Sequence, residues 1–342
     1  MAWHAVGEIE DSFEATKTLL LPFSLRRWLV MALAVFFVSG STTSGVNVGP
    51  FSTGSASTAV TETNAPGAVG NPVRDVPTTV PGGPDLFVVL AVVSAVIVLG
   101  IIFTYVSSVM EFVFVKMTAR QEVRVRGFFG GSMGKGVSLF AFRIAVGFVL
   151  AGTIALLVVM VILSGGFLLI PLLLLSPVFV LFAVALWLVG RFTVDFVVPV
   201  MLVDDVGIVK GWRTFFTELR AEWEQYTVYA VVRFVLGIVA SFAVGVGVLT
   251  LVLLLGIPFG IVALFGFFLG EFLAMQTVAL VLIVGVVILF ALTLVVAVVT
   301  FVQVPVQTYL RYYSLFVLGA VSPEYDMVDE VRSAIVTEDE TE

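Results

Sequence analysis

The chain has 342 residues, of which 60% are hydrophobic and 12% carry a charge, and its formal net charge is −7. Average globular chains are about 45–50% apolar and about 25% charged, so this chain has too little polar surface to cover a water-soluble particle. The composition excludes a soluble globular domain. It predicts an all-α fold, a polytopic integral membrane helical bundle of about six transmembrane helices plus amphipathic interfacial helices.

Residues 1–24 are predicted to form an N-terminal amphipathic helix. Positions spaced by three and four residues form one stripe of this helix, while acidic residues occupy the other faces. Pro22 ends the helix. The segment has no basic region followed by an apolar core, so a signal peptide is not expected. The stripe consists of Ala2, Val6, Ile9, Phe13, Thr16 and Leu20.

The segment 25–40 is the first expected transmembrane helix. It is marginal, because its strongly apolar part is shorter than the roughly 20 residues that a span needs. Residues 85–315 are predicted to contain the rest of the bundle. The outer turn of the last two spans is expected in 256–272, which leaves open a re-entrant piece, an interfacial piece or an extra span. The remaining spans are placed at 86–115, 139–163, 167–189 and, as a pair, inside 227–310.

Two segments are expected to lie outside the bundle. Residues 41–84 are rich in Gly, Ser, Thr and Pro and show no periodic apolar pattern. Such a composition cannot bury a core, so this segment is predicted to be an external flexible loop whose role the sequence leaves open. Residues 316–342, which end in TEDETE, are expected to form an acidic cytoplasmic tail.

The basic residues orient the bundle. Lys and Arg concentrate in the short cytoplasmic segments of membrane proteins. With the N-terminus inside and an even number of spans, all but one of the 17 Lys and Arg residues fall on the cytoplasmic side, the exception being Arg74. This distribution predicts a multi-pass protein of the cell membrane with both termini in the cytoplasm.

Two cytoplasmic segments, 116–138 and 204–225, are predicted to be amphipathic. In the second, Asp205 is expected to cap a helix whose apolar side chains cluster within about a third of its circumference. Such a helix lies in the membrane interface, with aromatic rings toward the acyl chains and basic groups near lipid phosphates. An equally good alternative is that the same face packs on the ends of the spans. The expected lipid contacts are Arg213, Arg220, Trp212, Phe215 and Trp223.

Ionisable residues in or near the spans are functional candidates, because charge is costly in the hydrocarbon. Five of the six candidates are expected at cytoplasmic ends of spans, where arginines reach lipid headgroups and Arg191 can pair with Asp195 four residues later. Glu271 is expected at the outer interface. A structural role is favoured over a transport site, because none of these residues is placed mid-span. The candidates are Glu111, Arg143, Arg191, Asp195, Arg233 and Glu271.

No catalytic, cofactor-binding or metal-binding residue is expected. The chain contains no cysteine and its only histidine is His4, so thiolate and imidazole chemistry lack their side chains. The stretch GGSMGKG at 130–136 fails the phosphate-loop pattern, because Phe129 replaces the first glycine and Gly136 replaces the serine or threonine. We therefore expect a protein that is not an enzyme and needs no cofactor.

Three stretches of the chain point to a family: MAWHAVGEIEDSFEATKTLLLPFSLRRWLVMALAVFFVSG, VVPVMLVDDVGIVKGWRTFF and VPVQTYLRYYSLFVLG. They resemble an uncharacterised haloarchaeal family of multi-pass membrane proteins. The layout is similar to the membrane domain attached to some glycerophosphoryl diester phosphodiesterases. The catalytic domain of those enzymes is missing from this chain, so the resemblance implies no hydrolase activity. Independently, 24 Asp and Glu against 17 Lys and Arg suit a salt-rich cytoplasm.

Two functions fit these observations. The first is a non-enzymatic integral membrane protein that organises lipid or a membrane partner, which includes a second copy of the chain. The second is a transporter-like protein for a small solute or lipid. The stretches 140–150 and 229–239 echo one another as parallel units, whereas inverted repeats are frequent in secondary transporters. A water-filled cavity lined by Glu111, Asp195 or Arg143 favours transport, and a dry bundle favours the first function. No nucleic acid is expected as a partner.

Overall fold

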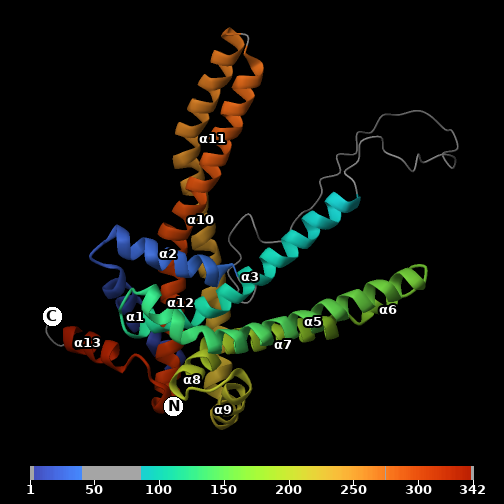
Figure 1. Ribbon diagram of the computed structural model, residues 1–342. Helices are drawn as coiled ribbons and strands as arrows, with labels where there is room; N and C mark the ends of the chain where they lie inside the picture. The colour runs from blue at the N-terminus through green and yellow to red at the C-terminus, as the bar shows by residue number, and fades with distance from the viewer. Residues whose placement is uncertain (1–3, 41–85, 274, 340–342) are drawn as a thin grey trace.

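The computed structural model describes residues 4–40, 86–273 and 275–339, and this part of the chain contains helices and no strand, so the all-α prediction is confirmed (Figure 1). The segment 41–84, expected as an external loop, lies outside the described residues. The α-helices are α1 (His4–Leu20), α2 (Leu25–Ser39), α3 (Leu86–Ala119), α4 (Val125–Phe129), α5 (Met133–Leu163), α6 (Leu169–Leu174), α7 (Ser176–Phe192), α8 (Val198–Val203), α9 (Ile208–Ala221), α10 (Trp223–Phe272), α11 (Gln276–Ala297), α12 (Val304–Val321) and α13 (Asp329–Asp339).

Shorter elements join several of these helices. A π-helical segment, Thr193–Val197, makes α7 and α8 continuous, and a second one, Val298–Gln303, joins α11 to α12. Single 3₁₀ turns at Gly130–Ser132 and Pro323–Tyr325 precede α5 and follow α12.

Five helices of the described part are long and apolar enough to cross a membrane. These are Leu86–Ala119, Val125–Leu163, Ser176–Val203, Trp223–Phe272 and Gln276–Val321. The segment 25–40, expected as the first transmembrane helix and a marginal one, forms α2. That helix has only 15 residues. At 1.5 Å per residue it measures about 22 Å, which is short of the roughly 30 Å of hydrocarbon.

The outer turn of the last pair of helices lies later than expected. Residues 256–272 do not turn: they continue α10 as one helix of 50 residues, with Pro258 inside it. The chain reverses between Phe272 and Gln276. At this end the two helices are in close contact, since a Cβ added to Gly270 would lie 2.1 Å from the Cβ of Ala279. The re-entrant piece, the interfacial piece and the extra span are therefore all wrong.

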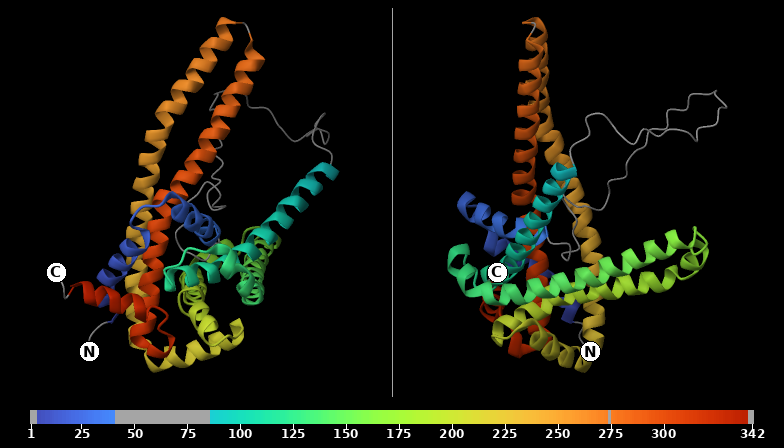
Figure 2. Two further views of the ribbon diagram at one scale, coloured as in Figure 1. Left: turned by 60° about the vertical axis from the view of Figure 1, so that its left-hand side comes forward. Right: turned by 45° about the vertical axis from the view of Figure 1, so that its right-hand side comes forward.

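Three arms project from a common base (Figures 1 and 2). One arm is the hairpin of α10 and α11, the second is the hairpin of α5 with α6 and α7, and the third is the N-terminal part of α3. The most apolar stretches of α3, α5 and α10 contain no buried residue. The base holds α1, α2, α8, α9, α12 and α13 together with the inner ends of the arms, and the buried core lies there.

Folded structure extends well past residue 316, where an acidic tail was expected. Residues 316–319 are the buried last part of α12, and α13 packs against α1. Val328, Val331 and Ile335 supply the apolar contacts of this segment. They are the reason that the segment folds back onto the base.

The helix α9 begins later than the sequence suggested. Its first residue is Ile208, and Gly207 occupies the N-cap position. Asp205 is not the cap: it has a φ of 55° and its carboxylate pairs with Lys135 Nζ at 2.8 Å. Gly211 lets α9 lie close to α8, because a Cβ there would come within 2.8 Å of Met201.

Candidate functional site

A group of buried charges lies in the base, where the inner ends of the helices meet. The carboxylate side chains of Glu111 and Asp195 are each only 1% exposed. Four arginine side chains, each between 3% and 7% exposed, surround them. We call these six residues the buried charge cluster: Glu111 from α3, Arg143 from α5, Arg191 from α7, Asp195 from the first π-helical segment, Arg233 from α10 and Arg311 from α12.

Glu111 holds two arginines. Arg143 Nη2 lies 3.3 Å from Glu111 Oε2, and Arg311 Nη2 donates to Glu111 Oε1. Each arginine has a further acceptor. Arg143 also donates to the hydroxyls of Ser107 and Ser108 at 3.2 and 3.3 Å, and Arg311 Nη1 donates to the carbonyl of Val194 at 2.8 Å. This half of the cluster thus connects α3, α5, α12 and the first π-helical segment.

Asp195 is the centre of the other half. Its Oδ2 accepts hydrogen bonds from Arg191 Nε and from the Tyr229 hydroxyl, both at 2.7 Å. Arg233 Nε forms a longer ion pair with the same oxygen, at 3.6 Å. The ring of Tyr229 stacks on Tyr313 of α12, with centroids 5.5 Å apart. Asp195 therefore ties α7 to α10, and the tyrosine pair ties α10 to α12.

Two prolines explain the local backbone of the site. Proline lacks an N–H and its ring clashes with the carbonyl four residues earlier, so an α-helix deviates there. Pro199 follows the π-helical segment that carries Asp195, and Pro305 follows the segment that ends at Gln303. Single-turn π segments inside α-helices occur frequently at functional sites. Here they place polar side chains of two helices at the same level of the base.

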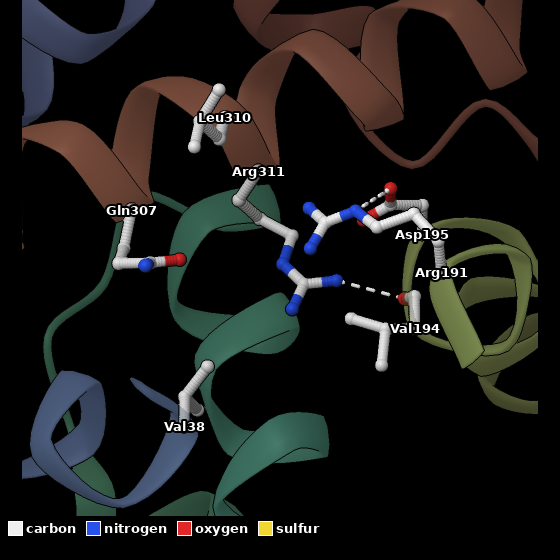
Figure 3. Close-up of a pocket in the computed structure, with 7 residues that line it drawn as sticks. All are labelled: Val38, Arg191, Val194, Asp195, Gln307, Leu310 and Arg311. Atoms are coloured by element: carbon white, nitrogen blue, oxygen red, sulfur yellow. Dashed lines mark hydrogen bonds and ion pairs between the residues drawn. The ribbon is translucent and has the colours of Figure 1, made fainter. Parts of the chain in front are cut away.

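A small cavity lies between the two halves of the cluster (Figure 3). Its interior volume of about 10 Å³ is close to that of one water molecule. The guanidinium groups of Arg191 and Arg311 point toward one another in it, and the amide oxygen of Gln307 points toward Arg311. The lining residues are Val38, Arg191, Val194, Asp195, Gln307, Leu310 and Arg311.

Comparison with known proteins assigns the chain to a family. Residues 3–328 match the sequence profile of a family of unknown function (DUF7544). The chain belongs to the DUF7544 family. No curated protein and no solved structure matches it. The matched range begins before α1 and ends after α12, so the whole buried charge cluster lies inside the DUF7544 region.

The structure brings together five of the six polar candidates named from the sequence of this DUF7544 protein. The pair of Arg191 and Asp195 is present, and Glu111, Arg143 and Arg233 lie in the same cluster. Glu271 lies apart from them, exposed at the outer end of α10. The arginines are buried in protein with acid partners, so the expectation that they reach lipid headgroups is wrong for them.

Sequence reasoning missed three residues of the site. Arg311 was assigned to the segment after the last span, although it is the lone charge between Glu271 and Glu324. That isolation inside an apolar stretch is the signal that could have found it. Tyr229 and Gln307 gave no such signal, because tyrosine and glutamine are common at membrane interfaces and helix ends.

The expected lipid-contact residues, four on α9 and Trp223 at the start of α10, differ in burial. Phe215 is fully buried and stacks on Phe196 with centroids 5.3 Å apart, so its predicted lipid contact is wrong. Trp212 is half-buried between Phe142 and Phe215. The other three residues are exposed: Arg213, Arg220 and Trp223. The packing alternative therefore holds for the inner face of α9, and its outer face keeps its basic and aromatic side chains on the surface.

The described residues contain no evident metal-binding site. They contain no group of three or more His, Cys, Asp or Glu side chains placed to hold an ion. Both buried carboxylates of the cluster are engaged by arginines. The arrangement is suited to holding helices together and to presenting positive charge to the cavity.

Proposed function

We propose that this DUF7544 protein is a non-enzymatic integral membrane protein that organises membrane lipid. The proposal rests on the exposed apolar surface of the three arms. The most apolar stretches of α3, α5 and α10 contain no buried residue, so most of the surface of the arms is open to acyl chains or to a membrane partner. A single chain therefore contacts far more lipid than a compact bundle of the same helices would.

The interior of the base supports this proposal over transport. A solute pathway needs a cavity or channel lined by polar groups. The cavity at the buried charge cluster has a volume of about 10 Å³, room for a single water. The surrounding arginines and carboxylates bond to one another across the helices and close the base.

The proposed orientation places the base on the cytoplasmic side of the cell membrane, with both termini there. It is supported by the basic residues, all but one of which fall on that side. The end of α2 supports it as well. Gly40 abuts Phe103, which lies near the middle of α3, so α2 brings the chain about halfway along that span.

We also propose a haloarchaeal origin and a layout like the phosphodiesterase membrane domain. The acidic composition, 24 Asp and Glu against 17 Lys and Arg, supports a salt-rich cytoplasm. In molar salt the Debye length is about 3 Å, so surface attraction is screened and acidic side chains maintain solubility.

A lipid-retention experiment tests the function. The protein is extracted with a polymer that keeps native lipid, and the lipid carried by each chain is quantified. We expect more anionic lipid than in the bulk membrane, and a smaller excess in the variant Arg213→Gln/Arg220→Gln, since each charge near the surface contributes about 1 kcal/mol at low salt. The matched control is Arg124→Gln/Arg126→Gln, which removes the same charge from α4 and its N-cap. Bulk-like lipid around the wild type would refute the proposal, and an equal loss in both variants would show a general charge effect.

A further inference from the structure

The arm formed by α10 and α11 is longer than a membrane is thick. Two charges bound the apolar part of α10: Arg233, which belongs to the buried charge cluster, and Glu271 at the outer end, and the sequence between them carries no charge. At 1.5 Å per residue, the 38 steps from one to the other measure about 57 Å. The hydrocarbon of a bilayer is roughly 30 Å thick. An arm that stood upright in the membrane would therefore end about 27 Å outside the hydrocarbon.

The other two arms fit one bilayer when they are measured from the same level. The contacts of the cluster hold Glu111 of α3, Arg143 of α5 and Arg233 of α10 together in the base. Charge is costly in the hydrocarbon, so this level marks the inner edge of the membrane. From there α5 extends about 30 Å to Leu163, and α3 extends about 38 Å to Leu86. The excess length is thus specific to the α10–α11 arm.

The surface of this arm is apolar all round. Large apolar side chains are exposed from its inner end, at Phe234, to its tip, at Phe272. The hydroxyls of Ser241, Thr250 and Thr293 donate to carbonyls four residues earlier in their own helices, so they need no water. A helix without a polar face is stable only inside a protein or in hydrocarbon. Figures 1 and 2 show the outer half of the arm clear of the other described elements, and only lipid covers every side of such a hairpin.

Only an oblique arm keeps this whole surface in hydrocarbon. We infer that the α10–α11 arm lies within the bilayer at about 60° to the membrane normal, because a helix of about 57 Å then spans roughly 30 Å of depth. Glu271 reaches the outer headgroups in this position. Long apolar helices in membranes tilt for the same reason, although their average tilt is about 20°. The arms diverge from the base, so the α5–α7 arm stands upright while the α10–α11 arm is inclined (Figures 1 and 2).

An oblique hairpin accounts for the organisation of lipid, and this step rests on the proposed function. Acyl chains above and below the arm meet its side before they reach the centre of the bilayer, so they do not extend fully. The bilayer around the arm is therefore thinner, and its chains are less ordered, than in the bulk membrane. The partner that the arm fits is the flexible acyl chain and not a particular headgroup.

The depth of two residues in the membrane tests the inclination. The native chain has no cysteine, so a fluorophore can be attached to Leu253→Cys or Phe267→Cys, both at exposed positions of α10. The labelled full-length protein is placed in vesicles of dioleoyl phosphatidylcholine. Quenching is then compared between lipids brominated at different depths and iodide in the water. In the inclined arm residue 253 lies about 16 Å from the inner edge, at the bilayer centre, and residue 267 lies inside the outer edge. We expect the deepest bromines to quench the first label most strongly, and iodide to reach neither label.

The matched control is Leu163→Cys on the α5–α7 arm, also at an exposed position. Leu163 and Leu253 each lie 20 residues along a helix from an arginine of the cluster, Arg143 and Arg233. Arms of equal inclination would therefore place both labels at one depth. We expect the Leu163 label at the outer edge, where shallow bromines quench it best. Equal depths of these two labels, or quenching of the Phe267 label by iodide, would overturn the inference.

The inclination and the proposed function fail in different ways. An upright arm together with an excess of anionic lipid in the lipid-retention experiment would reject the inclination and keep the lipid role. An inclined arm surrounded by bulk-like lipid would reject the lipid role and keep the inclination.

Discussion

Replacing Glu111 by Gln removes one of the two negative charges of the buried charge cluster while keeping the shape of the side chain. The cluster holds four arginines and two carboxylates, so its excess of positive charge then rises from two to three. Arg143 and Arg311 lose their ionic partner and face a neutral amide in its place. The variant therefore measures how far the base depends on charge compensation and not on side-chain volume.

The expected loss follows from burial and from the acceptors that stay. Removing one member of a buried ion pair costs about 3–5 kcal/mol, because its partner is left uncompensated. Glu111 is 1% exposed, so solvent screening does not reduce this figure. Arg143 keeps the hydroxyls of Ser107 and Ser108, and Arg311 keeps the carbonyl of Val194. These neutral acceptors place the expected loss near the lower end, at about 3 kcal/mol of unfolding free energy.

Reversible unfolding in mixed micelles, followed by tryptophan fluorescence, gives the free energies of the variants. The control is Glu271→Gln, the same substitution at an exposed acid on the outer end of α10, which should change stability by less than about 0.5 kcal/mol. The double variant Glu111→Gln/Arg143→Gln returns the excess of positive charge in the cluster from three to two, its wild-type value. Its loss should be at least about 1 kcal/mol smaller than the sum of the two single losses.

Two results would refute the electrostatic reasoning. One is a loss below about 1 kcal/mol for Glu111→Gln, which would place the change in the range of an ordinary neutral hydrogen bond. The other is strict additivity in the double variant, which would mean that Glu111 and Arg143 do not interact across their 3.3 Å separation.

Three further predictions concern the ends of the molecule. Because the native chain has no cysteine, an impermeant thiol reagent in intact cells should label Ser57→Cys and not Thr337→Cys; labelling of both would contradict cytoplasmic termini. Burial, aided by Asp204, raises the pKa of Tyr325 to about 12. The contribution of the Tyr325 hydroxyl to stability is therefore complete below the unfolded pKa of about 10 and is lost as the pH rises toward 12. The variant Tyr325→Phe should abolish that part of the alkaline unfolding profile. Gly270→Ala puts a methyl group against Ala279 and should cost about 1–3 kcal/mol in unfolding measurements, while Gly266→Ala, with open space around it, should be neutral or stabilising.

Composition and local spacing predicted those features of the fold that depend on residues close together in the sequence. An apolar, weakly charged chain can satisfy its backbone in a membrane only as helices or closed barrels, and the long apolar runs favoured helices. The pair of Arg191 and Asp195 was predictable because both residues belong to one helical turn. The length of α10 was not, because the glycines and Pro258 within 256–272 favoured a turn there, whereas the chain reverses at the polar residues Glu271 and Gln276.

The partners of Glu111 depend on distant parts of the chain. Arg143 is 32 residues away in sequence and Arg311 is 200 residues away. No local pattern reports such a separation. For the same reason, the apolar stripe of α9 showed that one face is covered but not what covers it. Phe196 and Tyr226, which pack on Phe215, come from two other segments, and their rings exclude lipid from the inner face.

The two prolines connect the sequence to the site in a way that neither spacing nor composition reveals. In an unbroken α-helix, side chains four residues apart stack on one face. A π-helical turn adds one residue to the helix, and it therefore rotates the side chains that follow it, about the helix axis, relative to those that precede it. The turn before Pro199 lets Arg191 and Tyr229 share one oxygen of Asp195, while the turn before Pro305 precedes Gln307 and Arg311 on α12. If Pro305→Ala allowed the second segment to become regular α-helix, Arg311 would rotate away from Glu111 and from the carbonyl of Val194, and unfolding measurements should show a loss of stability while the ion pairs of Asp195 stayed intact.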